Sequence, residues 1–277
     1  MAENCNHDCS SCSANCASRA EDMIQKAAAN AGSHVKKVIG VISGKGGVGK
    51  SMTSSLLAVA AGRLGLKAGI LDGDITGPSI PHMFGLNENA MSDGVNILPS
   101  YSDKGCAVMS LNLLLENPED PVIWRGGMIA SAVTQFWTDV AWGDLDYLFI
   151  DMPPGTGDVP LTVFQSLPVD GVIVVTTPQD LVSMVVEKAL RMAEKMDIPV
   201  LGIVENMSYI TCPDCGKKIY IFGEGHVEDF VKSHNIPNYA QMPIDRMLAG
   251  FADAGRVEEA PEEFISEMAK FLKSDDE

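Results

Sequence analysis

GKGGVGKS, residues Gly44 to Ser51, is the stretch that decides the fold of this 277-residue chain. It lies between an apolar run, Val38 to Ile42, and a helical pattern from Gly49 to Leu64. In the pattern GxxxxGK(S/T), the glycines let backbone N–H groups turn toward phosphate oxygens, and the following helix points its positive end at them. Lys50 is expected to reach the β and γ phosphates and Ser51 to ligate Mg²⁺. The sequence therefore predicts an ATP-binding P-loop whose contact residues are Gly44, Lys45, Gly46, Gly47, Val48, Gly49, Lys50, Ser51 and Met52.

Short apolar runs alternate with helical segments along the rest of the chain. Because the runs lack apolar/polar alternation and helices separate them, they predict a parallel sheet buried on both faces. The expected fold is α/β, a doubly wound and mostly parallel sheet of a P-loop NTPase, with a small CxxC hairpin inserted at residues 208–225. The expected strands are Val38 to Ile42, Ala68 to Leu71, Ala107 to Leu111, Tyr147 to Ile150, Val172 to Val175 and Val200 to Val204, and the expected helices after the first are Met128 to Trp142, Leu181 to Met196 and Glu259 to Leu272.

Composition limits the classes of partner. With 46% hydrophobic residues the chain has enough material for a buried core, and its length allows about one large or two small domains. The formal net charge of -17 argues against nucleic acid and against a membrane surface as primary partners. No apolar run approaches the roughly 18 residues that span a bilayer, so we expect a cytoplasmic protein. We expect a cysteine-rich appendage over residues 1–34 and an ATPase domain over residues 35–277.

Lys45 narrows the motif beyond a general P-loop. GKGGVGKS resembles the deviant Walker A motif of the MinD/ParA-like ATPases, in which a second lysine crosses a dimer interface to the partner's nucleotide. The resemblance implies that Lys45 and Lys50 are catalytic and that the protein is a homodimer, whereas Lys45 taken alone also fits a solvated surface lysine. Asp72 and Asp74 follow the second predicted strand. By the same resemblance Asp74 activates the attacking water and Asp72 supports Mg²⁺.

Later segments extend the resemblance. YLFIDMPPGTGD places Asp151 as a Walker B aspartate, followed by a switch loop in which Gly155 approaches the γ-phosphate. The family also places an asparagine and a Pro-x-Asp stretch near the adenine, and Asn206, Pro243 and Asp245 match these positions. These last three residues equally fit ordinary turn chemistry.

CPDC, with Cys212 and Cys215, has the form of a metal knuckle in which a proline and a glycine turn the chain so that both thiolates face one ion. Tetrahedral zinc or a 4Fe-4S cluster needs four ligands, so one chain supplies half a site and a two-fold dimer supplies the whole. GKGGVGKS, DMPPGTGD and CPDC in this order resemble the Mrp/ApbC family of iron-sulfur cluster carrier ATPases, over roughly Lys36 to the end. The resemblance implies a homodimer that hydrolyses ATP, bridges a 4Fe-4S cluster and transfers it to apo-proteins. A structural zinc site and a redox CxxC remain alternatives.

Four further cysteines lie in the first 16 residues, with spacings of 4, 3 and 4. On one straight helix the outer pair would stand roughly 16 Å apart, so metal binding there requires turns. The alternatives for this set are an accessory iron-sulfur cluster, zinc, or thiols without metal. The set consists of Cys5, Cys9, Cys12 and Cys16.

Two other functions compete with the carrier. A MinD/ParA-type positioning or segregation switch shares the nucleotide site, but the last helical segment, PEEFISEMAKFLKSDDE, is mostly acidic on its polar side, unlike a membrane-surface helix. A reductase like the nitrogenase iron protein also bridges a cluster between P-loop subunits. That family uses two separated single cysteines, so the paired CPDC knuckle favours a carrier.

Overall fold

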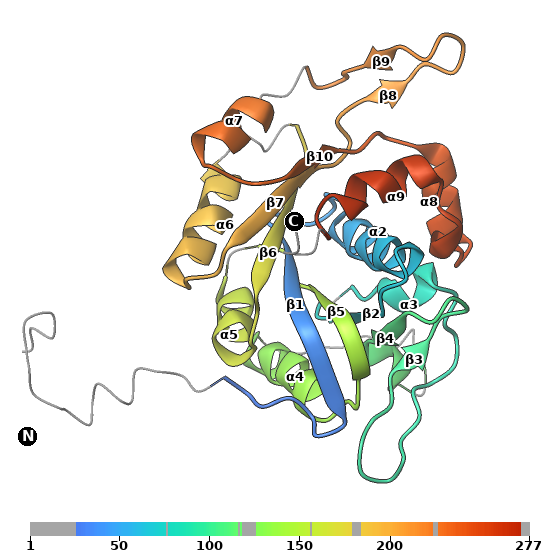
Figure 1. Cartoon of the computed structure of the whole chain (residues 1–277), viewed down its shortest axis with the longest axis vertical. Coiled ribbons are helices and arrows are strands. Elements are labelled where there is room, and N and C mark those ends of the chain that lie inside the picture. The colour runs from blue at the N-terminus through green and yellow to red at the C-terminus, as the bar shows by residue number, and fades with distance from the viewer. Residues whose placement is uncertain are drawn as a thin grey trace, which may run out of the picture.

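One mixed sheet organises the molecule (Figure 1). The computed structural model describes residues 26–75, 77–115, 117, 126–155, 157–178, 184–223 and 227–272. Eight strands follow the order β10-β7-β6-β1-β5-β2-β4-β3, and all neighbours pair in parallel except β3, which runs antiparallel to β4. This confirms the α/β, doubly wound fold. The strands are β1 (Ser33–Ser43), β2 (Ala68–Asp72), β3 (Ser100–Tyr101), β4 (Ala107–Met109), β5 (Gly143–Asp151), β6 (Gly171–Thr176), β7 (Val200–Glu205) and β10 (Tyr239–Gln241).

Helices cover both faces of the sheet. Buried residues of α2, α8 and α9 pack on one face, and those of α4, α5 and α6 pack on the other. In the described part of the chain, the α-helices are α2 (Lys50–Arg63), α3 (Ile80–Met83), α4 (Gly126–Thr138), α5 (Asp158–Ser166), α6 (Met184–Lys195), α7 (Val227–Ser233), α8 (Arg246–Asp253) and α9 (Glu262–Ala269), and short 3-10 helices span Leu111–Leu113 and Val257–Glu259.

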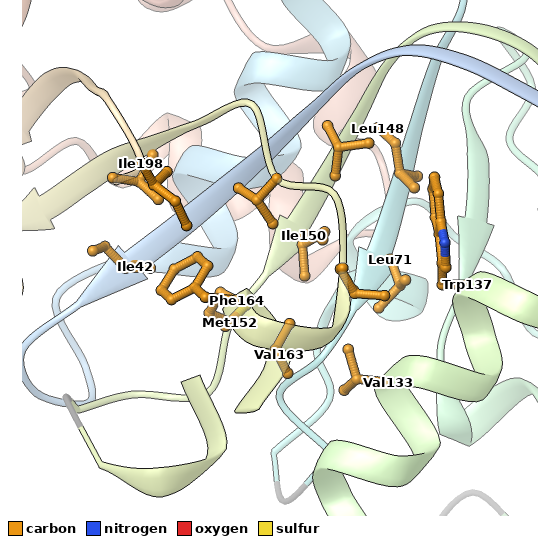
Figure 2. Packing of buried hydrophobic residues seen from close by; sticks show 14 of the residues in the cluster. Ile42, Leu71, Val133, Trp137, Leu148, Ile150, Met152, Val163, Phe164 and Ile198 are labelled. Atoms are coloured by element: carbon orange, nitrogen blue, oxygen red, sulfur yellow. The ribbon is translucent and has the colours of Figure 1, made fainter. Parts of the chain in front are cut away.

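The central strand β1 shows how the sequence makes two cores. Ile39 and Val41 contribute to the core beneath α2, whereas Val38 and Ile42 contribute to the core beneath α5. Side chains alternate between the faces of a strand, so a continuous apolar run is buried on both. Figure 2 shows the second core, where Phe164 lies beside Ile42 and Met152.

Several element boundaries differ from the sequence prediction. Helix α4 ends at Thr138, not at Trp142, because Val140 joins an isolated bridge to Ile97. Instead, the Trp142 backbone N–H donates a hydrogen bond to Ser33 Oγ at 2.8 Å, and Trp142 is buried. The last helix begins at Glu262, after a 3-10 turn. Strand β4 ends at Met109, and β10, with three residues, was not predicted.

The segment between β7 and α7 leaves the sheet. Its strands β8 (Ile210–Thr211) and β9 (Lys218–Ile219) pair antiparallel and form a separate two-stranded hairpin. In Figure 1 this hairpin projects beyond α7 and α9 at the top of the view. The Tyr209 and Tyr220 rings lie 5.9 Å apart at its base, and the Lys218 ammonium lies 4.0 Å from the Tyr209 ring centre. We call residues 209–220 the cysteine hairpin.

The described chain begins with a segment packed on the domain. Lys26 Nζ donates to the carbonyls of Phe164 and Leu167 at 2.8 and 2.7 Å. Strand β1 begins at Ser33, so the expected division at residue 34 lies within this strand. Among the described residues, no helix has both the length and the hydropathy to cross a bilayer.

Candidate nucleotide site and cysteine hairpin

The P-loop connects the end of β1 to the start of α2. Gly47 and Gly49 have φ of 78° and 88°, in the left-handed region that favours glycine. A Cβ on Gly49 would lie 2.0 Å from Nδ2 of Asn206, whereas a Cβ on Gly47 would meet nothing within 4 Å. Gly49 therefore serves both the turn and the close approach of Asn206.

A buried ion pair lies at the start of α2. The Lys50 side chain is 6% exposed, and its Nζ lies 2.8 Å from Oδ2 of Asp151 and 3.5 Å from Oδ2 of Asp74. Ser51 Oγ donates to Asp151 Oδ2 at 2.6 Å, and Ser54 Oγ lies within hydrogen-bond distance of Asp151 Oδ1 at 2.8 Å. Asp151 therefore gathers the lysine and both hydroxyls around one carboxylate.

Asp72 lies next to Asp151 because β2 and β5 pair these two residues directly. Complete burial, followed by the negative charge of Asp151, raises the pKa of Asp72 to about 8. Ser110 Oγ donates to Asp72 Oδ2 at 3.0 Å, and the backbone N–H of Asp74 donates to Oδ1 at 3.2 Å. The raised pKa favours the protonated form of Asp72, which limits its repulsion of Asp151.

Ser54 and Ser110 were missed by the sequence prediction. Ser54 lies one helical turn after Ser51, and Ser110 follows the end of β4. The sequence signal that could have found them is a hydroxyl residue one turn into the helix after the P-loop, or directly after a parallel strand. That signal is weak, since serines are common at both kinds of position.

The loop after β5, which the sequence predicts to be a switch loop, lies against the P-loop. The Gly155 N–H donates to the Ser43 carbonyl at 2.8 Å, and Gly155 has a φ of 98°. Ser43 Oγ in turn donates to the Lys45 carbonyl at 3.0 Å. Lys45 itself is exposed on the P-loop. The two loops therefore meet at the end of β1.

The residues expected near the adenine lie around the P-loop and α8. Asn206 Nδ2 donates to the Val48 carbonyl at 3.0 Å, so this side chain touches the P-loop backbone. Asp245 caps α8, where its carboxylate accepts the Leu248 N–H at 2.8 Å. Pro243 is half-buried two residues before this cap.

Cys212 and Cys215 lie in the turn of the cysteine hairpin. Cys212 is half-buried and Cys215 is exposed, and both are free thiols. The backbone N–H groups of Asp214 and Cys215, together with the Cys215 side chain, lower the pKa of Cys212. Within the described ranges, no group of three or more His, Cys, Asp or Glu side chains is placed to hold a metal ion. The four cysteines in the first 16 residues lie outside these ranges.

Comparisons with known proteins agree with this geometry. Residues 34–274 match the ParA family model described as NUBPL iron-transfer P-loop NTPase. The chain is 47% identical over 234 residues to an iron-sulfur cluster carrier protein of Clostridium perfringens, and the alignment spans 82% of each chain.

Two solved structures extend the comparison. A nucleotide-binding protein of Archaeoglobus fulgidus, solved in complex with ADP, is 47% identical, has a TM-score of 0.75 and aligns with 83% of this chain and 91% of its own. The septum site-determining protein MinD of Pyrococcus horikoshii has a TM-score of 0.57 at 19% identity, aligns with 86% of this chain and 94% of its own, and shares the fold alone. The motif resemblance is confirmed: the chain belongs to the ParA family described as NUBPL iron-transfer P-loop NTPases.

Proposed function

We propose that this protein is an ATPase that carries an iron-sulfur cluster and transfers it to apo-proteins. One observation carries the proposal: a free thiol pair, Cys212 and Cys215, lies on a hairpin that leaves the sheet directly beside the P-loop. The relative from Clostridium perfringens is an iron-sulfur cluster carrier protein, which supports the same assignment. We place the protein in the cytoplasm, where thiols stay reduced.

The P-loop residues fit a nucleotide with Mg²⁺. Lys50 provides a buried cation for the phosphates, and Ser51 provides a hydroxyl that hydrogen-bonds to Asp151. A Mg²⁺ ion favours oxygen ligands of this kind and, when bound, neutralises charge that develops on the phosphates. Asp74, half-buried 3.5 Å from Lys50 Nζ, is suited to orient the attacking water. We assign ATP hydrolysis to Lys50, Asp74 and Lys45.

The thiol pair fits half of a 4Fe-4S site. Two thiolates leave a cluster two ligands short, and a two-fold dimer brings a second pair from the other subunit. Cys215 is exposed and Cys212 half-exposed, so both are accessible for such a pairing. The exposure of Lys45 on the P-loop is compatible with a reach across the same interface. We therefore propose a homodimer with a shared cluster as cargo.

Reconstitution tests the cluster assignment. Wild type, Cys212→Ala/Cys215→Ala and Cys106→Ala are loaded anaerobically with iron and sulfide, and iron, sulfide, zinc and subunit mass are measured. Cys106 is buried in the core, so its variant is a matched loss of a thiol away from the hairpin. The double variant should lose the hairpin cluster and Cys106→Ala should keep it. Equal metal in wild type and double variant, with the same dimer mass, would refute the bridging site.

We further propose that the cysteine-rich amino-terminal segment holds an accessory cluster on Cys5, Cys9, Cys12 and Cys16. Removal of residues 1–19 separates this site from the hairpin. The truncated protein should lose the iron of the accessory cluster, and the iron that it retains should depend on Cys212 and Cys215. An unchanged iron content after truncation would contradict the accessory site.

Lys45 has its own test. Lys45→Ala should lose ATP hydrolysis and keep nucleotide binding, because the lysine acts on the partner's nucleotide rather than holding its own. Hydrolysis and equilibrium binding of ATP are measured on the same preparation. Wild-type turnover in this variant would contradict the action of Lys45 across the dimer.

A further inference from the structure

One short connection, residues 205–208, joins the P-loop to the cysteine hairpin. β7 ends at Glu205 in this connection, and Cys212 lies six positions after Asn206. The Asn206 side chain holds the Val48 carbonyl of the P-loop through a hydrogen bond of 3.0 Å. Any displacement of this carbonyl therefore acts on the segment that leads to the thiol pair.

The same connection is tied to the strand and loop before α8. Ser208 N–H donates to the Met242 carbonyl at 2.9 Å, and Met242 N–H donates to the Glu205 carbonyl at 2.9 Å. Ile244 N–H donates to the Tyr209 carbonyl at 2.8 Å, at the base of the hairpin. These bonds let the connection and the hairpin base move together rather than bend separately.

Two unfavourable features flank Asn206. Met207 has a φ of 58°; the other non-glycine residues with positive φ in the described chain, Asp197 and Asn235, are of types that tolerate this region. For a methionine the left-handed conformation is unfavourable, because Cβ comes too close to the following carbonyl oxygen. Glu205 is fully buried, with Oε2 accepting from Gln241 Nε2 at 3.0 Å and Oε1 lacking a hydrogen-bond partner. Such features persist where the surroundings enforce them, and they gather at functional and switching sites.

Nucleotide binding is expected to displace the P-loop end of this connection. Lys50 Nζ contacts Asp151 at 2.8 Å, and phosphate oxygens compete with this carboxylate for the ammonium. Because Gly49 and Val48 directly precede Lys50, a new position of the lysine alters the backbone that Asn206 contacts. The 2.0 Å approach between a Cβ at Gly49 and Asn206 Nδ2 shows how closely the two segments are fitted.

We propose that Asn206 is a positioning residue that transmits phosphate binding at the P-loop to Cys212 and Cys215, with Met207 as a stiff turn between them. The proposal rests on the proposed function for the identity of the two sites. It assigns a direction of influence: the nucleotide changes the accessibility and orientation of the thiol pair. The same coupling makes occupancy of the thiols alter nucleotide affinity.

The test uses full-length protein without a cluster, under reducing conditions. Iodoacetamide alkylation of Cys212 and Cys215 is followed by peptide mass spectrometry, with no nucleotide, with saturating Mg-ADP and with saturating Mg-ATP. The variants are Asn206→Ala, Met207→Gly and the control Asn238→Ala. Asn238 Nδ2 donates to the Leu201 carbonyl at 3.0 Å, so the control removes an equivalent bond near the opposite end of β7.

In wild type and in Asn238→Ala, nucleotide should change the alkylation rate of the pair by about fivefold or more. In Asn206→Ala, measured at nucleotide concentrations that saturate this variant, the difference should vanish. Met207→Gly relieves the positive φ and loosens the turn, so it should reduce the difference and keep nucleotide affinity. If Asn206→Ala no longer binds nucleotide, Met207→Gly decides alone.

If the alkylation rates of Cys212 and Cys215 in wild type do not change when nucleotide binds, the coupling is overturned. The coupling is also overturned if nucleotide-bound Asn206→Ala shows the same nucleotide-dependent change in alkylation rate as wild type. If Asn206→Ala does not bind nucleotide, the same result in Met207→Gly overturns it. Because the measurement uses thiols without metal, its failure leaves the cluster assignment intact. Conversely, failed reconstitution of a hairpin cluster would not abolish a nucleotide-dependent alkylation rate.

Discussion

The P-loop edge and the cysteine hairpin differ in how much of each site the single chain builds. At the P-loop edge, Lys50, Asp72 and Asp151 are buried, and Lys50 forms an ion pair with Asp151 within the single chain. In the hairpin, strands of two residues hold Cys215 exposed and Cys212 half-exposed. A preorganised site favours charge stabilisation, whereas an exposed pair of ligands suits a cargo that enters and leaves. Under the proposed function, this contrast gives hydrolysis to the rigid region and cluster transfer to the accessible one.

The largest expected effect follows from removing the buried cation. Lys50→Ala should lower ATP hydrolysis by about 10²–10³-fold and weaken nucleotide binding, because the phosphates lose their buried positive partner. The control is Lys36→Ala, since Lys36 also contacts an aspartate, Asp146, at 2.6 Å but at an exposed position. Steady-state hydrolysis and nucleotide titration check the prediction. Hydrolysis within a few-fold of wild type in Lys50→Ala would break the view of a preassembled site.

The second effect tests the fit between the P-loop and Asn206. Gly47→Ala should cost about 1–2 kcal/mol from its positive φ alone, whereas Gly49→Ala should cost about 3 kcal/mol or more because it also meets Asn206. Denaturant unfolding without nucleotide measures both. Gly49→Ala/Asn206→Ala should recover part of the loss. If the two single variants lose the same unfolding free energy, the close approach of Asn206 to Gly49 does not contribute to the effect.

Which parts of the fold and of the site could be predicted depends on what a short stretch of sequence encodes. The P-loop, the strand-end aspartates Asp72 and Asp151, and the parallel sheet were predictable because each depends on a short pattern with a known geometry. The contact between Asn206 and Val48 was not, since it joins residues 158 positions apart. The same reason hid the hydrogen bond from Ser110 to Asp72, which needs the order of β5, β2 and β4 in the sheet.

Short elements were also beyond prediction. β10 has three residues and gains its place from pairing with β7 rather than from its own pattern. Helix α4 ends early because Val140 finds a bridge partner in Ile97, a tertiary event. In both cases the deciding interaction is distant in sequence, so local propensity carries little information.

The third effect concerns Asp72 and pH. Its pKa rises from 3.8 to about 8 in the folded chain, so between these values the folded chain holds a proton that the unfolded chain has released. The free energy of unfolding therefore falls as pH rises through this window, and this contribution is lost above about pH 8. Asp72→Asn cannot titrate, so its melting temperature should fall less than that of wild type between pH 6 and pH 9, by about one to a few degrees.

Asp146→Asn is the control for this pH dependence. Lys36 and the backbone N–H of Lys67 lower the pKa of Asp146, so its contribution is lost only as pH falls through the acidic range. Between pH 6 and pH 9 this variant should follow the wild-type slope. Melting curves at matched ionic strength provide the measurement, and parallel slopes for wild type and Asp72→Asn would argue against a protonated Asp72.

The smallest expected effect lies at the hairpin. In cluster-free protein, Cys212→Ala/Cys215→Ala should move the melting temperature by no more than about 2 °C, because the two side chains fill no core and the hairpin stands apart from the sheet. After anaerobic loading, wild type should gain stability from the bound cluster and the variant should not. A large loss of stability in the cluster-free variant would mean that the thiols help to hold the fold. The contrast with the P-loop edge would then fail, since both regions would be built by the chain alone.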